Sequence, residues 1–360
     1  MKKIGIICEY NPFHNGHIYH INKIKEMFKD SMIIAVMSGN FTQRGIPSIL
    51  SKNEKTKIAL NNNIDLVVEL PTIYATQGAD IFAYGAVSIL NQLKIDYLVF
   101  GSESNDIKKL EDIAKFQLDN STYHEKVKNY LKEGFNYPTA MAKALENNNI
   151  STPNDLLGLS YIKAIKLLKS NIIPLTIKRT NNFHSKDLEN AISSATAIRE
   201  AISNKKDIKK YVPKEVLNIL KEKKEIDFFP ILKYKIITEG VNIKKYLTVD
   251  EGIENRIIKV INDCNSLDEL IQKIKTKRYT YNKLSRMFIH ILCSITKDDA
   301  IENKEISYIR ILGFNPTGQQ HLNKIKKELI VPLIVTEKYY KELLKDQIRI
   351  DNIYDLISKK

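Results

Sequence analysis

The chain alternates short apolar runs with longer segments whose apolar residues recur every three or four positions. The apolar runs, each of which predicts a buried β-strand, are residues 2–8, 31–37, 64–70, 95–104 and 172–179. The segments with the spacing of amphipathic helices are residues 17–28, 52–62 and 78–93. Apolar strands that alternate with helices are typical of a parallel sheet covered on both faces. The pattern therefore predicts an α/β fold.

The pattern changes in the second half of the chain. Residues 105–170 are mainly helical in pattern, and Asn154, after Pro153, lies at a predicted helix start. Beyond about residue 205 the alternation stops, and lysine-rich helical patterns follow at residues 213–223, 253–262, 267–278 and 338–347. We predict two parts: a sheet-containing domain over residues 1–210 and a mainly helical, basic domain over residues 211–360.

Polar residues follow four of the predicted strands, at the point where each strand ends. They are His14 to His17, Ser38 to Arg44, Gly101 to Glu103, and Arg179. Ligands of open parallel sheets bind beyond the carboxyl ends of the strands. We therefore expect these residues to converge on one crevice.

The stretch EYNPFHNGH, residues 9–17, contains the densest group of candidate chemistry. It joins the first strand to a helix, and the N–H groups and dipole at a helix N-terminus favour phosphate binding. Gly16 allows close approach of a ligand, and the imidazoles of His14 and His17 can donate hydrogen bonds to phosphate oxygens. Such donors, aimed at an α-phosphate, stabilise the charge that develops when an oxygen attacks it and pyrophosphate leaves. His20, one turn later, faces either this site or the helix surface.

The composition is that of a globular protein, with 43% hydrophobic and 27% charged residues. No apolar run approaches the roughly 18 to 20 residues that cross a bilayer, so we expect a cytoplasmic protein without a membrane partner. The three cysteines have no CxxC spacing, so we predict neither a zinc site nor a disulfide framework.

The net charge of +14 points to a polyanionic partner, nucleic acid before acidic membrane. Residues 271–286 combine lysines and arginines with Tyr279 and Tyr281, which could stack on an unpaired base. The alternative is a solvated helix face with half-buried tyrosines. The candidate RNA-binding residues are Lys275, Lys277, Arg278 and Arg286.

Two stretches together are similar to the signatures of the HIGH-type nucleotidyltransferase superfamily. The first is NPFHNGH, and the second is ISSATAIRE at residues 192–200, which differs from the usual I-S-S-T-x-I-R by an additional Ala195. The resemblance implies a Rossmann-like nucleotidyltransferase fold, with the second signature on the β- and γ-phosphates. It makes Ser194, Thr196 and Arg199 the candidates there, with the choice between Ser194 and Thr196 open. Together with His14 and His17, Arg199 is the third predicted catalytic residue.

Eight blocks in this order resemble the bacterial tRNA(Met) cytidine acetate ligase family more narrowly. They are EYNPFHNGH, VMSGNFTQRG, DLVVELP, FGSES, PNDLLGLSYIKA, TIKRT, SSATAIRE and KTKRYTYNKLSRMFIHIL. The resemblance implies activation of acetate with ATP and acetyl transfer to N4 of the wobble cytidine of elongator tRNA(Met). The positions it matches to ATP contacts are Ile7, Cys8, Glu9, Tyr10, Asn11, Pro12, Phe13, His14, Asn15, Gly16, His17, Ile18, Tyr19, His20, Gly101, Asn154 and Arg179.

Other assignments remain open on the residues alone. ATP chemistry implies Mg²⁺, but no carboxylate stands out as its ligand. Arg44 is a candidate either for anion binding or for a surface ion pair. The alternative functions are an adenylyltransferase acting on a phosphorylated small metabolite and a non-catalytic RNA-binding protein with a vestigial nucleotide site. The sequence contains no clear K-M-S-K-S loop, which disfavours an aminoacyl-tRNA synthetase.

Overall fold

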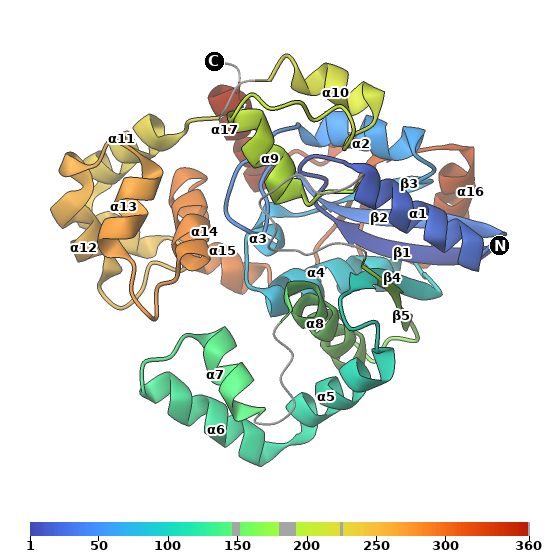
Figure 1. Ribbon diagram of the computed structural model, residues 1–360, viewed down its shortest axis with the longest axis horizontal. Helices are drawn as coiled ribbons and strands as arrows, with labels where there is room; N and C mark the ends of the chain where they lie inside the picture. The colour runs from blue at the N-terminus through green and yellow to red at the C-terminus, as the bar shows by residue number, and fades with distance from the viewer. Residues whose placement is uncertain (146–151, 180–191, 224–225, 359–360) are drawn as a thin grey trace.

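A seven-stranded sheet forms the centre of the computed structural model, which describes residues 1–145, 152–179, 192–223 and 226–358. The strand order is β5-β4-β1-β2-β3-β6-β7 (Figure 1). The bounds are β1 Lys2–Cys8, β2 Ser31–Ser38, β3 Leu66–Leu70, β4 Tyr97–Ser102, β5 Ile173–Lys178, β6 Ile309–Phe314 and β7 Leu333–Ile334. The predicted α/β class is confirmed.

The five predicted strands form one parallel block. β1 pairs with β2 from Lys2 opposite Ser31 to Cys8 opposite Met37, and its other edge pairs with β4. The chain thus adds β2 and β3 on one side of β1, and then β4 and β5 on its other side. The strand order therefore reverses between β1 and β4, which makes this pair a topological switch point. In open α/β sheets, ligands bind above such a point, at the carboxyl ends of the strands.

Helices cover both faces of the sheet, each over its own apolar core. One core packs residues of α1 (Asn15–Met27), α2 (Lys52–Asn61), α9 (Ala195–Ser203) and α10 (Lys214–Leu220) against one face. The other packs α4 (Ala79–Gln92), α8 (Pro153–Leu167) and α16 (Pro316–Ile325) against the opposite face. The two-sided burial explains the nearly continuous apolar strands of the sequence. The short helix α3 (Thr72–Ala75) precedes α4.

A third core belongs to a helical group that Figure 1 shows to one side of the sheet. Its helices are α11 (Phe229–Glu239), α12 (Ile253–Val260), α13 (Leu267–Ile274) and α14 (Tyr281–Leu292). Helix α17 (Lys345–Ser358) contributes Ile350, Tyr354 and Ile357, and α15 (Lys297–Glu302) follows the group in the chain. Phe41, from the loop after β2, is fully buried in the same core, so a loop of the sheet domain enters the helical group.

Helices α5 (Ile107–Asp119), α6 (Ser121–Lys132) and α7 (Tyr137–Ala144) form an arm between β4 and α8. They correspond to the helical pattern expected between residues 105 and 170, of which 146–151 lie outside the described residues. The arm also contacts the segment between α13 and α14, because Asn136 Nδ2 donates to the Lys277 carbonyl at 3.2 Å.

The sequence analysis missed the last two strands, which lie in the part expected to be mainly helical. β6 pairs antiparallel with β3, and β7 pairs with β6. The prediction of a helix over residues 338–347 was also wrong, because α17 begins only at Lys345. Leu344 is instead buried against Tyr308 and Ile334 beside β6 and β7, so tertiary packing overrides the local helical pattern. The division of the chain at residue 210 stays a prediction.

Candidate functional site

The turn between β1 and α1 is shaped by His14 and His17. His14 is the N-cap of α1, and its Nδ1 accepts a hydrogen bond from the Gly16 N–H at 3.0 Å. The His14 N–H in turn donates to Nδ1 of His17 at 3.1 Å. Together these two bonds form a capping box in which histidines replace the usual hydroxyl and carboxylate side chains. A side chain at Gly16 would lie 2.9 Å from Nδ1 of His14, so glycine is required here.

The two bonds also fix the tautomers of the histidines. A neutral imidazole whose Nδ1 accepts a hydrogen bond carries its proton on Nε2. Burial, reinforced by Arg179 and Arg199, lowers the pKa of His14 to about 3. Burial and His14, His20 and Arg179 lower the pKa of His17 well below its usual value. The rings stack with centroids 3.8 Å apart. At neutral pH the site therefore has two adjacent uncharged Nε2–H donors.

The predicted residues after β4 and β5 lie beside the histidines. Arg179 lies within electrostatic range of His14, His17 and His20, and its side chain passes 3.2 Å from the position a Cβ of Gly101 would take. Arg179 Nη1 donates to Asn154 Oδ1 at 3.4 Å, and Asn154 Nδ2 donates to Glu103 at 2.5 Å.

His20 faces this site rather than the helix surface, because its ring interacts electrostatically with Arg179 and its Nε2 is buried. That nitrogen has no hydrogen-bond partner among the described residues. Burial and Arg179 lower the pKa of His20 to about 4.

The second signature opens helix α9 on the other side of the histidines. The Ser194 hydroxyl caps this helix by accepting from the Ala197 N–H at 3.1 Å. The Thr196 hydroxyl accepts from Arg199 at 3.3 Å and from Arg44 at 3.0 Å. Arg199 Nη1 also donates to the Asn11 carbonyl at 2.5 Å, which joins the two signatures directly. Thus Ser194 serves the helix cap, whereas Thr196 lies between two guanidinium groups.

Other residues of the first motif build the turn. Tyr10 and Phe13 are buried and meet edge to face with centroids 4.8 Å apart, and the Asn11–Pro12 peptide bond is cis. Burial raises the pKa of the Cys8 thiol to about 12, so Cys8 is not a thiolate nucleophile. Of the remaining predicted contacts, Ile7, Ile18 and Tyr19 pack against the cores, and Asn15 Nδ2 donates to the Lys210 carbonyl at 2.8 Å.

Lys55 was missed by the sequence analysis. It is fully buried on α2, and its Nζ donates to the carbonyls of Glu9 at 3.0 Å, Ser38 at 2.8 Å and Gly39 at 2.6 Å. One ammonium group thus joins the carboxyl ends of β1 and β2. The spacing could have revealed it, because Lys55 shares a helix face with the apolar residues Ile58 and Ala59.

The predicted RNA-binding residues are distributed over different environments. Lys275 and Lys277 are exposed, whereas exposed Arg278 pairs with Glu251 at 2.8 Å and donates to the Leu131 carbonyl at 3.2 Å. Half-buried Arg286 donates to the Gln43 carbonyl at 3.3 Å, on the loop after β2. The Tyr279 ring is only 4% exposed, which contradicts the expectation that it stacks on a base. Tyr281 remains accessible, at 43%.

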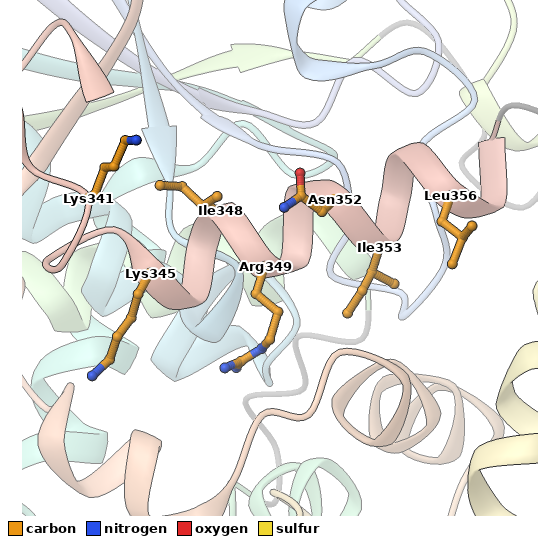
Figure 2. Close-up of a pocket in the computed structure, with 7 residues that line it drawn as sticks. All are labelled: Lys341, Lys345, Ile348, Arg349, Asn352, Ile353 and Leu356. Atoms are coloured by element: carbon orange, nitrogen blue, oxygen red, sulfur yellow. The ribbon is translucent and has the colours of Figure 1, made fainter. Parts of the chain in front are cut away.

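Within the described parts of the chain, no three His, Cys, Asp or Glu side chains come together as a metal site. A search of the same residues finds no helix of the length and apolarity that crosses a bilayer. Figure 2 shows an open hollow along α17, remote in sequence from both signatures. It is lined by Lys341, Lys345, Ile348, Arg349, Asn352, Ile353 and Leu356.

A switch-point site with paired histidines at one helix N-terminus and an arginine on a second helix defines a nucleotidyltransferase of the HIGH class, and the HIGH Nucleotidyl Transferase family model matches residues 1–360. The chain belongs to the tRNA(Met) cytidine acetate ligase family. The protein of that name from Caldicellulosiruptor bescii is 40% identical, over 99% of this chain and 94% of the relative. The Clostridium tetani protein of the same name is also 40% identical, over 100% and 96%. The crystal structure of Thermotoga maritima TmcAL bound with alpha-thio ATP superposes with a TM-score of 0.88 at 31% identity, covering 100% of this chain and 95% of that one.

Proposed function

We propose that this protein activates acetate with ATP and transfers the acetyl group to N4 of the wobble cytidine of elongator tRNA(Met). The names of the relatives support the substrates, and the thio-ATP complex of the Thermotoga protein supports the nucleotide. The observation that carries the chemistry is the stacked pair of His14 and His17, each with Nδ1 engaged by the backbone and Nε2–H available for the α-phosphate.

In the first step an acetate oxygen forms a bond to the α-phosphorus while the bond to the leaving pyrophosphate breaks. Negative charge grows on the α-phosphoryl oxygens. The two neutral Nε2–H groups stabilise this charge by hydrogen bonding in a buried site, with no proton transferred. Arg199 extends from α9 towards Thr196 in the first turn of that helix, where it offsets charge on the pyrophosphate. Mg²⁺ would be carried mainly by phosphate oxygens and water rather than by a cage of carboxylates.

In the second step the cytidine amine forms a bond to the acetyl carbon, AMP leaves, and the amine releases a proton. The exposed basic residues Lys275, Lys277 and Arg278 are the proposed contacts to the tRNA backbone. Because ATP and tRNA are both cytoplasmic, the reaction belongs in that compartment.

The test supplies the protein with labelled acetate, ATP and Mg²⁺, with and without tRNA. We expect AMP and pyrophosphate from the first step and label in tRNA(Met) from the second. His14→Ala and His17→Ala should each lose at least about a hundredfold in rate, because each removes a transition-state donor. His124→Ala is the matched control, since His124 is exposed on α6 and far from the site in sequence.

Two outcomes would contradict the proposal. Pyrophosphate release that depends on a phosphorylated small molecule, with no label in tRNA, would indicate a metabolite adenylyltransferase. Binding of RNA without any ATP turnover would indicate a non-catalytic protein with a vestigial site.

A further inference from the structure

The loop between β2 and α2, residues 39–48, is held in one conformation by its own hydrogen bonds. The Thr42 N–H donates to the Ile46 carbonyl at 3.0 Å, and the Gly45 N–H donates to the Thr42 carbonyl at 2.9 Å. At its base the Ser48 N–H donates to the Asn40 carbonyl at 2.8 Å. A tight turn of this kind fixes the side chains at its tip, among them Arg44.

Arg44 extends from this loop to the second signature. Its Nη1 lies 3.0 Å from Thr196 Oγ1, and Nη2 of Arg199 lies 3.3 Å from the same oxygen. Burial, reinforced by Arg44, lowers the pKa of Arg199 to about 10, and the Glu9 carboxylate acts in the opposite direction. Two guanidinium groups at one hydroxyl concentrate positive charge and hydrogen-bond donors, a combination that suits a polyvalent anion such as a phosphate chain.

The position of the arginine pair indicates which anion it receives. Arg199 also donates to the Asn11 carbonyl, three residues before the histidine that caps α1, so the pair and the histidines border the same site. Thr196, whose hydroxyl both arginines contact, further lies in the first turn of α9, where helix N–H groups favour phosphate. We propose that Arg44 is a further ATP-binding residue, which together with Arg199 binds the β- and γ-phosphates. This inference rests on the proposed use of ATP.

Helix α14 positions Arg44 from the other side of the loop. Gly45 has a φ of +76°, and a side chain there would lie 2.3 Å from the Arg286 backbone nitrogen and 2.4 Å from the Ser285 carbonyl carbon. The Arg286 side chain donates to the Gln43 carbonyl at 3.3 Å, and Phe41 is buried in the core that contains α14. The loop therefore contacts α14 on both sides of Arg44. Arg286 is a positioning residue in this arrangement.

The experiment compares binding of ATP and AMP by calorimetry, without acetate or tRNA. Arg44→Ala should weaken ATP binding about ten- to a hundredfold, the value of a charge-assisted hydrogen bond, and leave AMP binding unchanged because AMP lacks the distal phosphates. Arg256→Ala, an exposed arginine on α12, is the control that removes one positive charge elsewhere. Equal loss of ATP and AMP affinity, or no loss of either, would overturn the assignment.

Steady-state assays distinguish whether Arg44 binds the triphosphate of ATP or the carboxylate of acetate. Arg44→Ala should raise the KM for ATP and leave the KM for acetate within about twofold; a rise for acetate alone would assign the pair to the carboxylate instead. Arg286→Ala should raise the KM for ATP in the same direction, and Arg286→Lys should restore it in part. ATP and AMP binding is measured without any acyl transfer. The binding result therefore tests the role of Arg44 even if a carboxylate other than acetate is the substrate.

Discussion

The backbone around His14 determines what its ring can do. A free histidine exchanges its proton between two nitrogens and titrates near neutrality, whereas here one nitrogen is occupied by a backbone N–H and burial prevents protonation. The same bond that starts helix α1 therefore directs the remaining N–H into the site. One residue provides both the cap and the donor.

The lowered pKa values of the three site histidines make stability depend on pH, and the lowered pKa values of His290 and His321 add to this dependence. The pKa of His14 is about 3 and that of His20 about 4, and that of His17 is also lowered, whereas the unfolded chain binds protons near pH 6.5. Between pH 6.5 and about 4 the unfolded state binds more protons than the folded state. The free energy of unfolding should therefore fall as the pH falls, by up to about 1.4 kcal/mol per pH unit for each histidine.

Urea unfolding at pH 7.5, 6 and 5 measures this dependence. His20→Phe removes one of the three groups and should make the slope shallower, while His124→Phe, on the exposed face of α6, should leave it unchanged. Parallel slopes for the wild type and His20→Phe would contradict the interpretation.

At the scale of elements, a buried group of charges attaches α17 to the sheet. Lys52 of α2 pairs with Glu69 of β3 at 3.0 Å and also with Asp351 of α17. Arg310 of β6 pairs with Glu69 at 2.7 Å and with Asp351 at 2.9 Å. The Asp351 carboxylate also accepts from Asn40 at 3.0 Å, so it supports the base of the loop that carries Arg44.

Removing Asp351 from this group should destabilise the protein strongly, because the two buried cations Lys52 and Arg310 then share the one buried carboxylate of Glu69. Asp351→Asn should lower the free energy of unfolding by about 3 to 5 kcal/mol. Asp346→Asn, on the same helix, removes an exposed pair with Arg349 and should cost less than about 1 kcal/mol. Chemical denaturation of the two variants compares them directly, and equal losses would contradict a special role for the buried group.

Local patterns predicted elements best where burial and periodicity agree. β2 and β3 were predicted closely because nearly all of their residues are buried and most of them are apolar. β6 was missed because its sequence, IRILGF, contains Arg310, whose charge is neutralised by Glu69, Glu337 and Asp351, all distant in the chain. The histidine pair could be predicted from its motif and the burial of Lys55 from its helix face, whereas the partners of Lys55 and the contact of Arg44 with Thr196 depend on tertiary structure.

For the molecule as a whole, the excess of 56 lysines and arginines over 42 acidic residues should draw tRNA to its surface. Lys275→Ala/Lys277→Ala should weaken tRNA binding and reduce the salt dependence of log K by about 0.7 to 0.9 for each lost contact. Arg278 should contribute less, because Glu251 already neutralises it.

Filter binding across a salt series, with ATP affinity measured in parallel, tests this surface. Lys108→Ala/Lys109→Ala on α5 removes the same charge from two exposed positions and serves as the control. An identical salt dependence in both double variants would indicate diffuse attraction without a defined contact surface.

The last two strands also determine when the sheet can be completed. Residues 309–334 are synthesised after all five parallel strands, yet β6 covers the outer edge of β3 and Arg310 neutralises Glu69 within it. Until β6 is synthesised, the outer edge of β3 therefore keeps open backbone hydrogen-bonding groups, while Glu69 can already pair with Lys52. An apolar sheet edge exposed in this way invites pairing with other chains, so the nascent protein should depend on chaperones until its final residues emerge.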